Sequence, residues 1–332
     1  MSRARRVLFK NSLYEIVPRA REGLPLPPTE VSNQLLTGIL ARTQRDQKVV
    51  LCNFVDMNNH THQHCIPENP EQHAKFYMEY QKKVTDTVRK LTKRQRLNLW
   101  EKRPSVTKID GLEDAVKRLV YIFLNPAKAG LVSSIDEYPG LTTWKAFSTC
   151  EASVEAEVRL KAYWTPVSRL ERLPSGNRLS PAQDEAMAAR LRDSGESVEY
   201  ELVIKPLAWL KVYGVHEPQR IEEIRQRIIN QVYSAEAKLA TERKEEGRSV
   251  VGAERLRYQE YLRPHVPKKK ERNIYVICGD HARRPVLIRM FQDIFAQCRK
   301  CYQALKAGLP HEWPPGTFIP WVPPRAFQAA CL

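Results

Sequence analysis

The sequence lacks the long apolar segments that carry a protein into or across a membrane. No stretch of its 332 residues approaches the roughly 18 apolar residues that a transmembrane helix needs. The first six residues, Met-Ser-Arg-Ala-Arg-Arg, are basic, but no apolar signal-peptide core follows them. These absences predict a cytoplasmic protein with no membrane partner.

Regularly spaced cysteines and internal repeats are also missing. The chain has seven cysteines, an odd number without regular spacing, which argues against a secreted disulfide scaffold. Cys298 and Cys301 form a lone CxxC inside a helical pattern. No second CxxC or nearby pair of histidines accompanies them, so no zinc site is expected there.

Acidic residues are scarce relative to basic ones. The chain carries 54 Lys and Arg against 38 Asp and Glu, a formal net charge of +16. Such an excess is the electrostatic footprint of a protein that binds the phosphate backbone of nucleic acid. The alternative is a basic protein with an ordinary solvated surface. A nucleic-acid binder would also be associated with the nucleoid.

Strand-like and helix-like patterns alternate over the first 150 residues. The expected order is a strand over 7–17, a helix from Glu30 to about 47, strands over 48–55 and 60–66, a helix over 71–96, a strand over 100–109 and a helix over 111–124. Thr29 is the expected N-cap of the first helix, and Pro126 and Gly130 are expected to end the last one. This order describes an α+β fold, a ferredoxin-like split β-α-β sheet that is mostly antiparallel. Its helices would cover one face and leave the other open for a ligand.

The character of the chain changes after residue 148. Short helical segments and loops with Pro and Gly are expected over 151–218, followed by charged helices over 220–246 and 284–307 and a Pro- and Trp-rich tail. We therefore expect a catalytic domain over 1–148 and a mainly helical, basic extension over 149–332.

Three of the eight histidines lie within five residues, at alternate positions. If the segment is a strand, its period of two places His60, His62 and His64 on one face. Imidazoles at that spacing form half of a site for a divalent metal. His64 is the uncertain member: a further ligand, a proton-transfer group, or a packed residue behind the ligands.

A second group of polar residues lies on the expected helix over 111–124. Tyr121 and Asn125 are four residues apart and therefore share one helical face. Asp114, Lys117 and Lys128 continue this polar stripe. Together the two sites suggest that His60 and His62 hold a metal, that the Asn125 amide adds a ligand, and that the Tyr121 hydroxyl attacks phosphorus. A free tyrosine is a poor nucleophile, because its pKa is near ~10.

These two segments resemble a known family. His60-Thr61-His62 resembles the HUH motif, and residues 121–132, Tyr-Ile-Phe-Leu-Asn-Pro-Ala-Lys-Ala-Gly-Leu-Val, are similar to the catalytic helix of REP-associated tyrosine transposases. These are single-tyrosine HUH enzymes related to the IS200-like transposases. Glu137-Tyr-Pro-Gly and the following Trp144 also resemble that family.

The resemblance implies a ferredoxin-like fold, a Mg or Mn ion, and cleavage of single-stranded, hairpin-forming DNA through a 5′-phosphotyrosine intermediate. By matching position, His60 and His62 would be metal ligands, Tyr121 the nucleophile and Asn125 the third ligand. The candidates for DNA contact are Lys117, Arg118, Lys128, Lys268, Lys269 and Lys270.

Two other functions remain open. One is a domesticated, non-catalytic DNA- or RNA-binding protein that keeps the fold. The other is a metallonuclease in which activated water attacks and Tyr121 only orients the phosphate. The sequence does not decide between a monomer and a homodimer.

Overall fold

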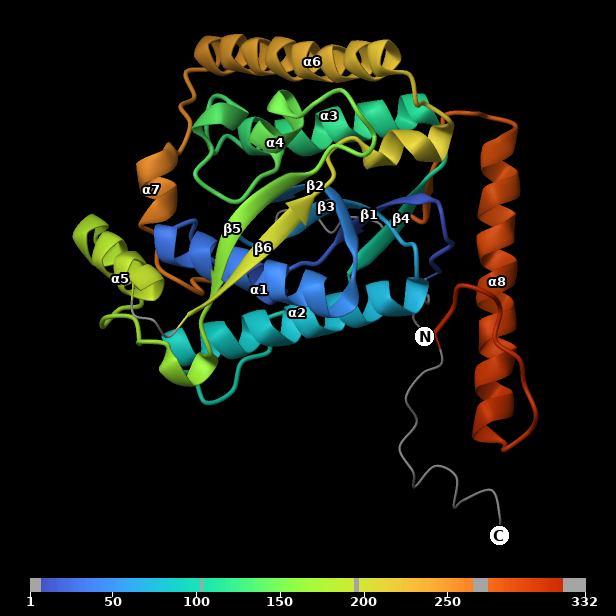
Figure 1. The fold of residues 1–332 in the computed structure, drawn as a ribbon, viewed down its shortest axis with the longest axis horizontal. Helices are drawn as coiled ribbons and strands as arrows, with labels where there is room; N and C mark the ends of the chain where they lie inside the picture. Colours follow the sequence, from blue (N-terminus) through green and yellow to red (C-terminus); the bar gives the residue numbers. More distant parts are fainter. Residues whose placement is uncertain (1–6, 102–103, 194–196, 265–273, 319–332) are drawn as a thin grey trace.

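The computed structural model describes residues 7–101, 104–193, 197–264 and 274–318. Within these ranges, a seven-stranded sheet in the order β5-β6-β2-β3-β1-β4-β7 lies between two layers of helices (Figure 1). Helices α1 and α2 cover one face, and α3, α4 and α6 lie on the other. No helix in the described ranges is both long enough and apolar enough to span a bilayer.

The first four strands form the expected ferredoxin-like core. They are β1 (Leu13–Val17), β2 (Val50–Asp56), β3 (Thr61–Ile66) and β4 (Ser105–Ile109), and all neighbouring pairs are antiparallel in the order β2-β3-β1-β4. Helix α1 (Glu30–Gln47) connects β1 to β2, and α2 (Pro70–Leu91) connects β3 to β4. The order of the elements and the α+β class are therefore confirmed.

Helix α1 begins where the sequence predicts. The Thr29 hydroxyl oxygen accepts a hydrogen bond from the backbone N–H of Ser32 at 3.0 Å, which caps the helix. The helix ends at Gln47, and the next residue, Lys48, adopts a left-handed conformation with φ 48°. Ile39 follows the buried Leu35 by four residues and the buried Leu36 by three, so the three share one helical face, which packs against the sheet.

Alternate residues of β3 point to opposite faces of the sheet. Gln63 faces the α1–α2 layer, where its side-chain oxygen accepts a 2.5 Å hydrogen bond from the Tyr77 hydroxyl of α2. Cys65 packs in the same layer. His62 points the other way, toward Glu15 and α3. The alternation predicted for the histidine segment is confirmed.

The second face of the sheet is covered, so the expectation of an open face is wrong. Helix α3 (Leu112–Lys128) lies across it and buries Leu119, Ile122 and Phe123 among the residues that include Leu13 of β1 and Val55 of β2. The reason is the wide apolar side of α3, which needs a partner and finds it on the sheet. Helix α4 (Trp144–Thr149) packs beside it.

Helix α3 is also longer than expected. Pro126 lies inside its last turn rather than beyond its end. The backbone N–H groups of Ala129 and Gly130 donate to the carbonyls of Asn125 and Ala127, so helical bonding continues past the proline. A proline has no N–H, so the helix loses the bond from position 126 to the Ile122 carbonyl, but the bonds from Ala129 and Gly130 show that the turn is kept. Asn125 therefore stays in helical register with Tyr121.

The segment after residue 148 adds strands to the same sheet. Strands β5 (Val158–Trp164) and β6 (Val198–Ile204) pair antiparallel, β6 joins β2 at one position, and β7 (Val276–Ile277) joins β4. The expectation of only short helices and loops over 151–218 is wrong for β5 and β6. Both strands alternate apolar residues with polar ones, the pattern of a half-buried strand that the expectation overlooked, and on the exposed side Arg159 pairs with Glu201 at 2.9 Å.

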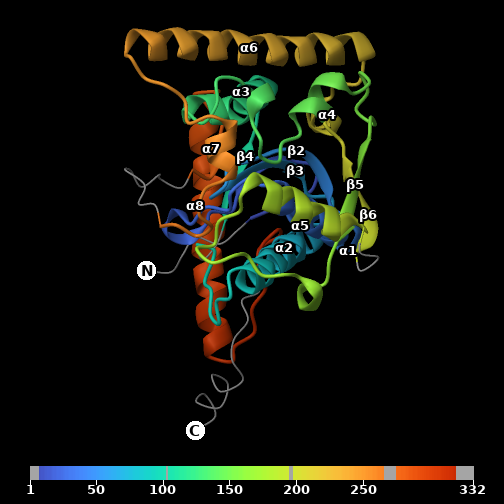
Figure 2. The same cartoon turned by 90° about the vertical axis from the view of Figure 1, so that its left-hand side faces the viewer.

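The other regular elements described in the extension are helices, as predicted. They are α5 (Pro181–Asp193), α6 (Pro218–Glu245), α7 (Ala253–Arg257) and α8 (Arg283–Lys306). Within the described ranges, short 3-10 helices cover Arg21–Gly23, Ile135–Glu137, Val167–Arg169 and Ala208–Tyr213. Helix α6 runs along the outer side of α3, and α8 stands at one side of the molecule and projects beyond the sheet (Figures 1 and 2).

Candidate functional site

Two of the alternating histidines form a pair at the start of β3. His60 lies just before β3 and forms an isolated antiparallel bridge with Arg19. His62 is the second residue of β3. Their ring centroids lie 4.9 Å apart and the ring planes meet at 75°. His60 as a residue is half-buried, whereas His62 is 3% exposed. The pair therefore lies between the covered interior and the surface.

Hydrogen bonds at Nδ1 orient both imidazoles. His62 Nδ1 lies 2.7 Å from Glu15 Oε1, and His60 Nδ1 lies 2.7 Å from Asn59 Oδ1. Both oxygens are acceptors, so each ring carries its proton on Nδ1 in these bonds. That tautomer leaves Nε2 of each ring as the nitrogen with a lone pair for a metal.

Glu15 belongs to this site although the sequence-based prediction did not include it. Its carboxylate, on β1, is 2% exposed and also accepts hydrogen bonds from Arg118 Nε at 2.7 Å and Arg118 Nη2 at 2.8 Å. Burial alone would raise the pKa of this carboxyl, but the hydrogen bond from His62 and the charge of Arg118 lower it to about 2. A signal was present: Glu15 is a charge in the middle of an otherwise apolar strand.

Tyr121 of α3 lies against this histidine pair. The centroids of the Tyr121 and His62 rings are 6.0 Å apart, with the planes at 82°. Two cations flank the Tyr121 ring: the Arg118 guanidinium carbon is 4.2 Å from its centroid and Lys128 Nζ is 4.9 Å from it. The structure therefore brings the histidine strand and the tyrosine helix together, although some sixty residues separate them.

Asn125 lies one turn after Tyr121 and is 8% exposed. Its side-chain Nδ2 is buried and has no hydrogen-bond partner within the described residues. Because the oxygen and nitrogen of an amide are assigned from their surroundings, one end of this amide is unpaired. A buried, unpaired amide is costly, and a ligand at this point would relieve the cost. The unpaired atom is a donor, so it does not test the role of the Asn125 oxygen as a metal ligand, which stays a prediction.

His64 differs from the other two histidines. It is fully buried, and neither ring nitrogen has a hydrogen-bond partner in the described part of the chain. Burial lowers its pKa to about 4, which keeps the ring neutral. Among the described residues, no three His, Cys, Asp or Glu side chains are grouped to hold a metal. A metal at His60 and His62 would therefore need Asn125 or substrate oxygens as further ligands.

The cations predicted to contact DNA take different positions. Lys117 and Lys128 are exposed on α3. Arg118 is engaged with Glu15, so its first role is to shape the site. Lys268, Lys269 and Lys270 lie outside the described residues.

The extension holds α3 at its N-terminal end. Arg227 of α6 forms a 2.9 Å ion pair with Glu113, and the backbone N–H of Gly279 donates to the Asp114 carboxylate at 2.6 Å. Both acids lie in the first turn of α3, where negative charge also complements the helix dipole.

The extension also holds the C-terminal end of α3. Arg243 of α6 is 9% exposed, and its Nη1 donates to the carbonyl of Ala127 at 2.9 Å. The buried Glu236 carboxylate accepts from the backbone N–H of Ile135 at 2.6 Å, just beyond the helix. A cation at the last carbonyls of a helix is favourable, and here it fixes the turn that carries Asn125 and Lys128.

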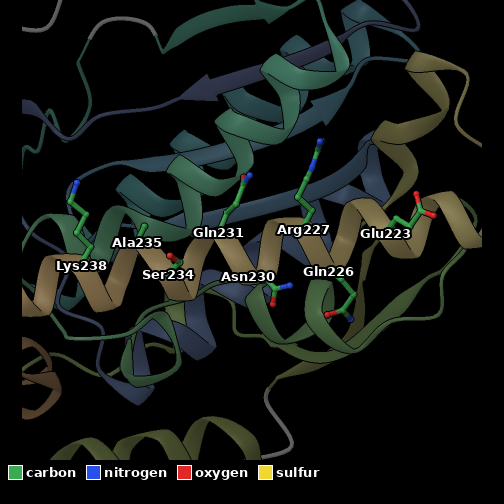
Figure 3. A pocket seen from close by; sticks show the side chains of 8 residues that line it. All are labelled: Glu223, Gln226, Arg227, Asn230, Gln231, Ser234, Ala235 and Lys238. Carbon is green, nitrogen blue, oxygen red and sulfur yellow. The ribbon is translucent and has the colours of Figure 1, made fainter.

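A groove on the surface of α6 lies elsewhere. Its lining residues are Glu223, Gln226, Arg227, Asn230, Gln231, Ser234, Ala235 and Lys238 (Figure 3). All of them belong to one helix, and none belongs to the histidine–tyrosine site. Its mixed charges contain no convergent group of catalytic type, so we do not assign the site to this groove.

Comparisons with known proteins add one likeness. No protein-family model matches the chain, and no curated protein does. Among solved structures, the chain is similar to "Structure of the REP associates tyrosine transposase bound to a REP hairpin", with a TM-score of 0.37 and 21% identity over 44% of this chain and 84% of that one. A likeness at this level establishes neither a shared fold nor a shared activity.

Proposed function

We propose that the protein is a metal-dependent endonuclease and transposase that cleaves and rejoins single-stranded, hairpin-forming DNA through a 5′-phosphotyrosine intermediate. The observation that carries the proposal is the convergence of Tyr121 with the His60–His62 pair. A nucleophile beside two oriented imidazoles, flanked by cations, suits phosphoryl transfer.

The metal site would consist of Nε2 of His60, Nε2 of His62 and the Asn125 amide. Imidazole and amide donors of this kind accept first-row divalent ions and leave open positions for substrate oxygens. When bound, Mg²⁺ or Mn²⁺ would supply Lewis-acid polarisation of the scissile phosphate. Glu15 would keep the His62 ring in place through its bond to Nδ1.

Tyr121 would be the nucleophile. Its oxygen forms a bond to phosphorus, the bond from phosphorus to the 3′ oxygen breaks, and the 5′ phosphate remains on the tyrosine. The phenolic proton passes to solvent and the departing 3′ oxygen takes up a proton from solvent. Arg118 and Lys128 beside the ring would offset the negative charge that builds on the oxygen. Rejoining is the reverse attack by a 3′ hydroxyl on the phosphotyrosine.

A protein nucleophile is favoured over water by this arrangement. The covalent link conserves the phosphodiester bond for rejoining, whereas hydrolysis loses it. Attack by Tyr121 and attack by water are distinguished by incubating 5′-labelled or 3′-labelled hairpin DNA with the protein and Mn²⁺ or Mg²⁺. We expect a denaturation-resistant adduct that is absent from Tyr121→Phe and present in the control Tyr302→Phe on α8. Cleavage without an adduct would favour the metallonuclease, and binding without cleavage would favour the non-catalytic protein.

A further inference from the structure

A strongly basic cleft lies at the C-terminal end of α2, away from the histidine–tyrosine site. Its lining residues are Asp86, Arg89, Lys90, Lys93, Arg94, Gln95, Val167 and Arg172, and we call it the basic cleft. Five of these side chains are cations, and among the described residues that line it Asp86 is the single acid. Asp86 is paired with Arg89 at 3.2 Å, so most of the positive charge is not balanced within the cleft.

The walls of the basic cleft come from two segments that are fastened together. The backbone N–H of Leu173 donates to the carbonyl of Leu91 at 2.8 Å, and Lys90 Nζ lies 3.5 Å from the carbonyl oxygen of Ser168. Arg172, from the extension, thereby faces the cations of α2 across a fixed gap. Like charges held on opposite walls repel one another, and an anion between them would remove that cost.

The chain path places the basic cleft at the same end of the sheet as the His60–His62 pair. Strand β3 runs from the His60 end to Ile66, and α2 then runs back across the other face (Figure 1). Trp100, which bridges Ala20 at the His60 end, donates its Nε1–H to the carbonyl of Gln81 at 2.9 Å, and α2 continues from there for about 15 Å to Leu91. Figure 2 views the molecule from this side.

The segment after α2 leads from the basic cleft directly to the edge beside His60. The carbonyl of Leu99 accepts from the backbone N–H of Arg21 at 2.7 Å, and Trp100 forms a bridge with Ala20. The N–H of Ala20 in turn donates to the carbonyl of Asn59, the neighbour of His60, at 2.6 Å. A DNA strand that left the site along this edge would meet the cations of the cleft.

We propose that the basic cleft binds the phosphate backbone of the single-stranded DNA flank that extends from the cleavage site. This inference deepens the proposed function and rests on it for the identity of the strand. Cations on both walls suit one backbone that enters between them, better than the convex surface of a duplex. The cleft would anchor the strand without reading its bases, because its lining residues offer charge and no aromatic platform.

The test compares Lys93→Ala/Arg94→Ala with the wild type and with a control of equal charge, Lys238→Ala/Lys244→Ala on α6. All four side chains are exposed, so folding should be preserved, which thermal unfolding verifies. Binding is measured by fluorescence anisotropy on one hairpin that carries single-stranded flanks of increasing length, over a range of salt concentrations. A second variant, Arg172→Ala, removes a cation from the opposite wall.

We expect wild-type affinity to rise once the flank reaches the cleft, and this rise to be absent in Lys93→Ala/Arg94→Ala and reduced in Arg172→Ala. Loss of two phosphate contacts would lower the slope of log affinity against log salt by about 1.4. The control should match the wild type. Equal flank dependence and salt slope in all variants would overturn the proposal, as would a gain that requires a duplex flank.

The adduct assay distinguishes a failure of the basic-cleft proposal from a failure of the proposed nuclease function. If no adduct forms but the flank effect is present and lost in Lys93→Ala/Arg94→Ala, the cleft inference stands and the nuclease proposal fails. If the adduct forms and the flank effect is the same in every variant, the cleft inference alone fails.

Discussion

The Glu15 carboxylate and the His62 imidazole are joined by a 2.7 Å hydrogen bond between Oε1 and Nδ1. The same carboxylate holds Arg118, whose guanidinium lies over the Tyr121 ring. A single buried acid on β1 thus connects a metal-binding candidate on β3 with the surroundings of the nucleophile on α3. This connection makes the position of each group depend on the others.

Substitution Glu15→Gln tests this connection. The amide keeps the size of the side chain but removes the charge, so it can no longer accept from both His62 and Arg118 with full strength. We expect Mn²⁺ affinity, measured by calorimetry, to fall about 10- to 100-fold, as is typical when the partner of a metal-binding imidazole is altered. The exposed Glu199→Gln on β6 is the control. An unchanged Mn²⁺ affinity in Glu15→Gln would show that the carboxylate does not support the ligand.

Arg243→Ala tests whether α6 positions the last turn of α3. The variant leaves the Ala127 carbonyl without its charged donor, and we expect the free energy of unfolding to fall by about 1–3 kcal/mol. We also expect slower adduct formation at saturating metal, because Asn125 and Lys128 lie in that turn. Lys244→Ala, exposed on the same helix, serves for comparison. A variant that loses stability but forms the adduct at the wild-type rate contradicts the positioning role.

Asp56→Asn should stabilise the protein at neutral pH. Burial raises the pKa of Asp56 to about 6, against the hydrogen bonds from Asn58 and Thr61 that lower it. Because the unfolded value is near 3.8, the folded protein binds more protons between about pH 4 and 6, and wild-type stability falls as pH rises through that window.

An amide at position 56 avoids the cost of a buried charge and can still accept from the Asn58 N–H. We therefore expect Asp56→Asn to be about 1–2 kcal/mol more stable than the wild type at pH 7, with the difference gone below about pH 4. Urea unfolding at a series of pH values measures this difference in the free energy of unfolding, with the exposed Asp293→Asn as reference. A difference that does not change with pH refutes this explanation.

Asp184→Ala should weaken the attachment of the extension to the core. The Asp184 carboxylate of α5 accepts from the backbone N–H groups of Glu30 and Val31 at 2.8 and 3.0 Å, and so caps α1 from a distant part of the chain. We expect a loss of about 1–2 kcal/mol in the free energy of unfolding. Glu185→Ala, an exposed neighbour, should have little effect. Equal stability of Asp184→Ala and Glu185→Ala would show that the Asp184 carboxylate does not stabilise α1.

The sequence predicts the elements whose signals are local. Thr29 marks the start of α1, the alternation at His60, His62 and His64 marks a strand face, and the spacing of Tyr121 and Asn125 marks a helix face. Each of these depends on residues a few positions apart, and the structure agrees on all three.

What the sequence could not predict depends on distant partners. Glu15 becomes significant only when His62 and Arg118 are brought to it by the sheet and by α3. Strand β6 alternates apolar and charged residues, but its pairing with β5 and β2 joins positions far apart in the chain and does not follow from that alternation. The covering of the second sheet face follows from packing of α3, which hydrophobic periodicity alone does not orient.

The most direct test of the central claim is mass spectrometry of the protein after reaction with hairpin DNA and Mn²⁺. We predict that, after nuclease digestion, one tryptic peptide carries a nucleotide joined through its 5′ phosphate to Tyr121, and that this peptide is unmodified in His62→Ala. Cleaved DNA with free 5′ phosphates and an unmodified Tyr121 peptide would contradict the account.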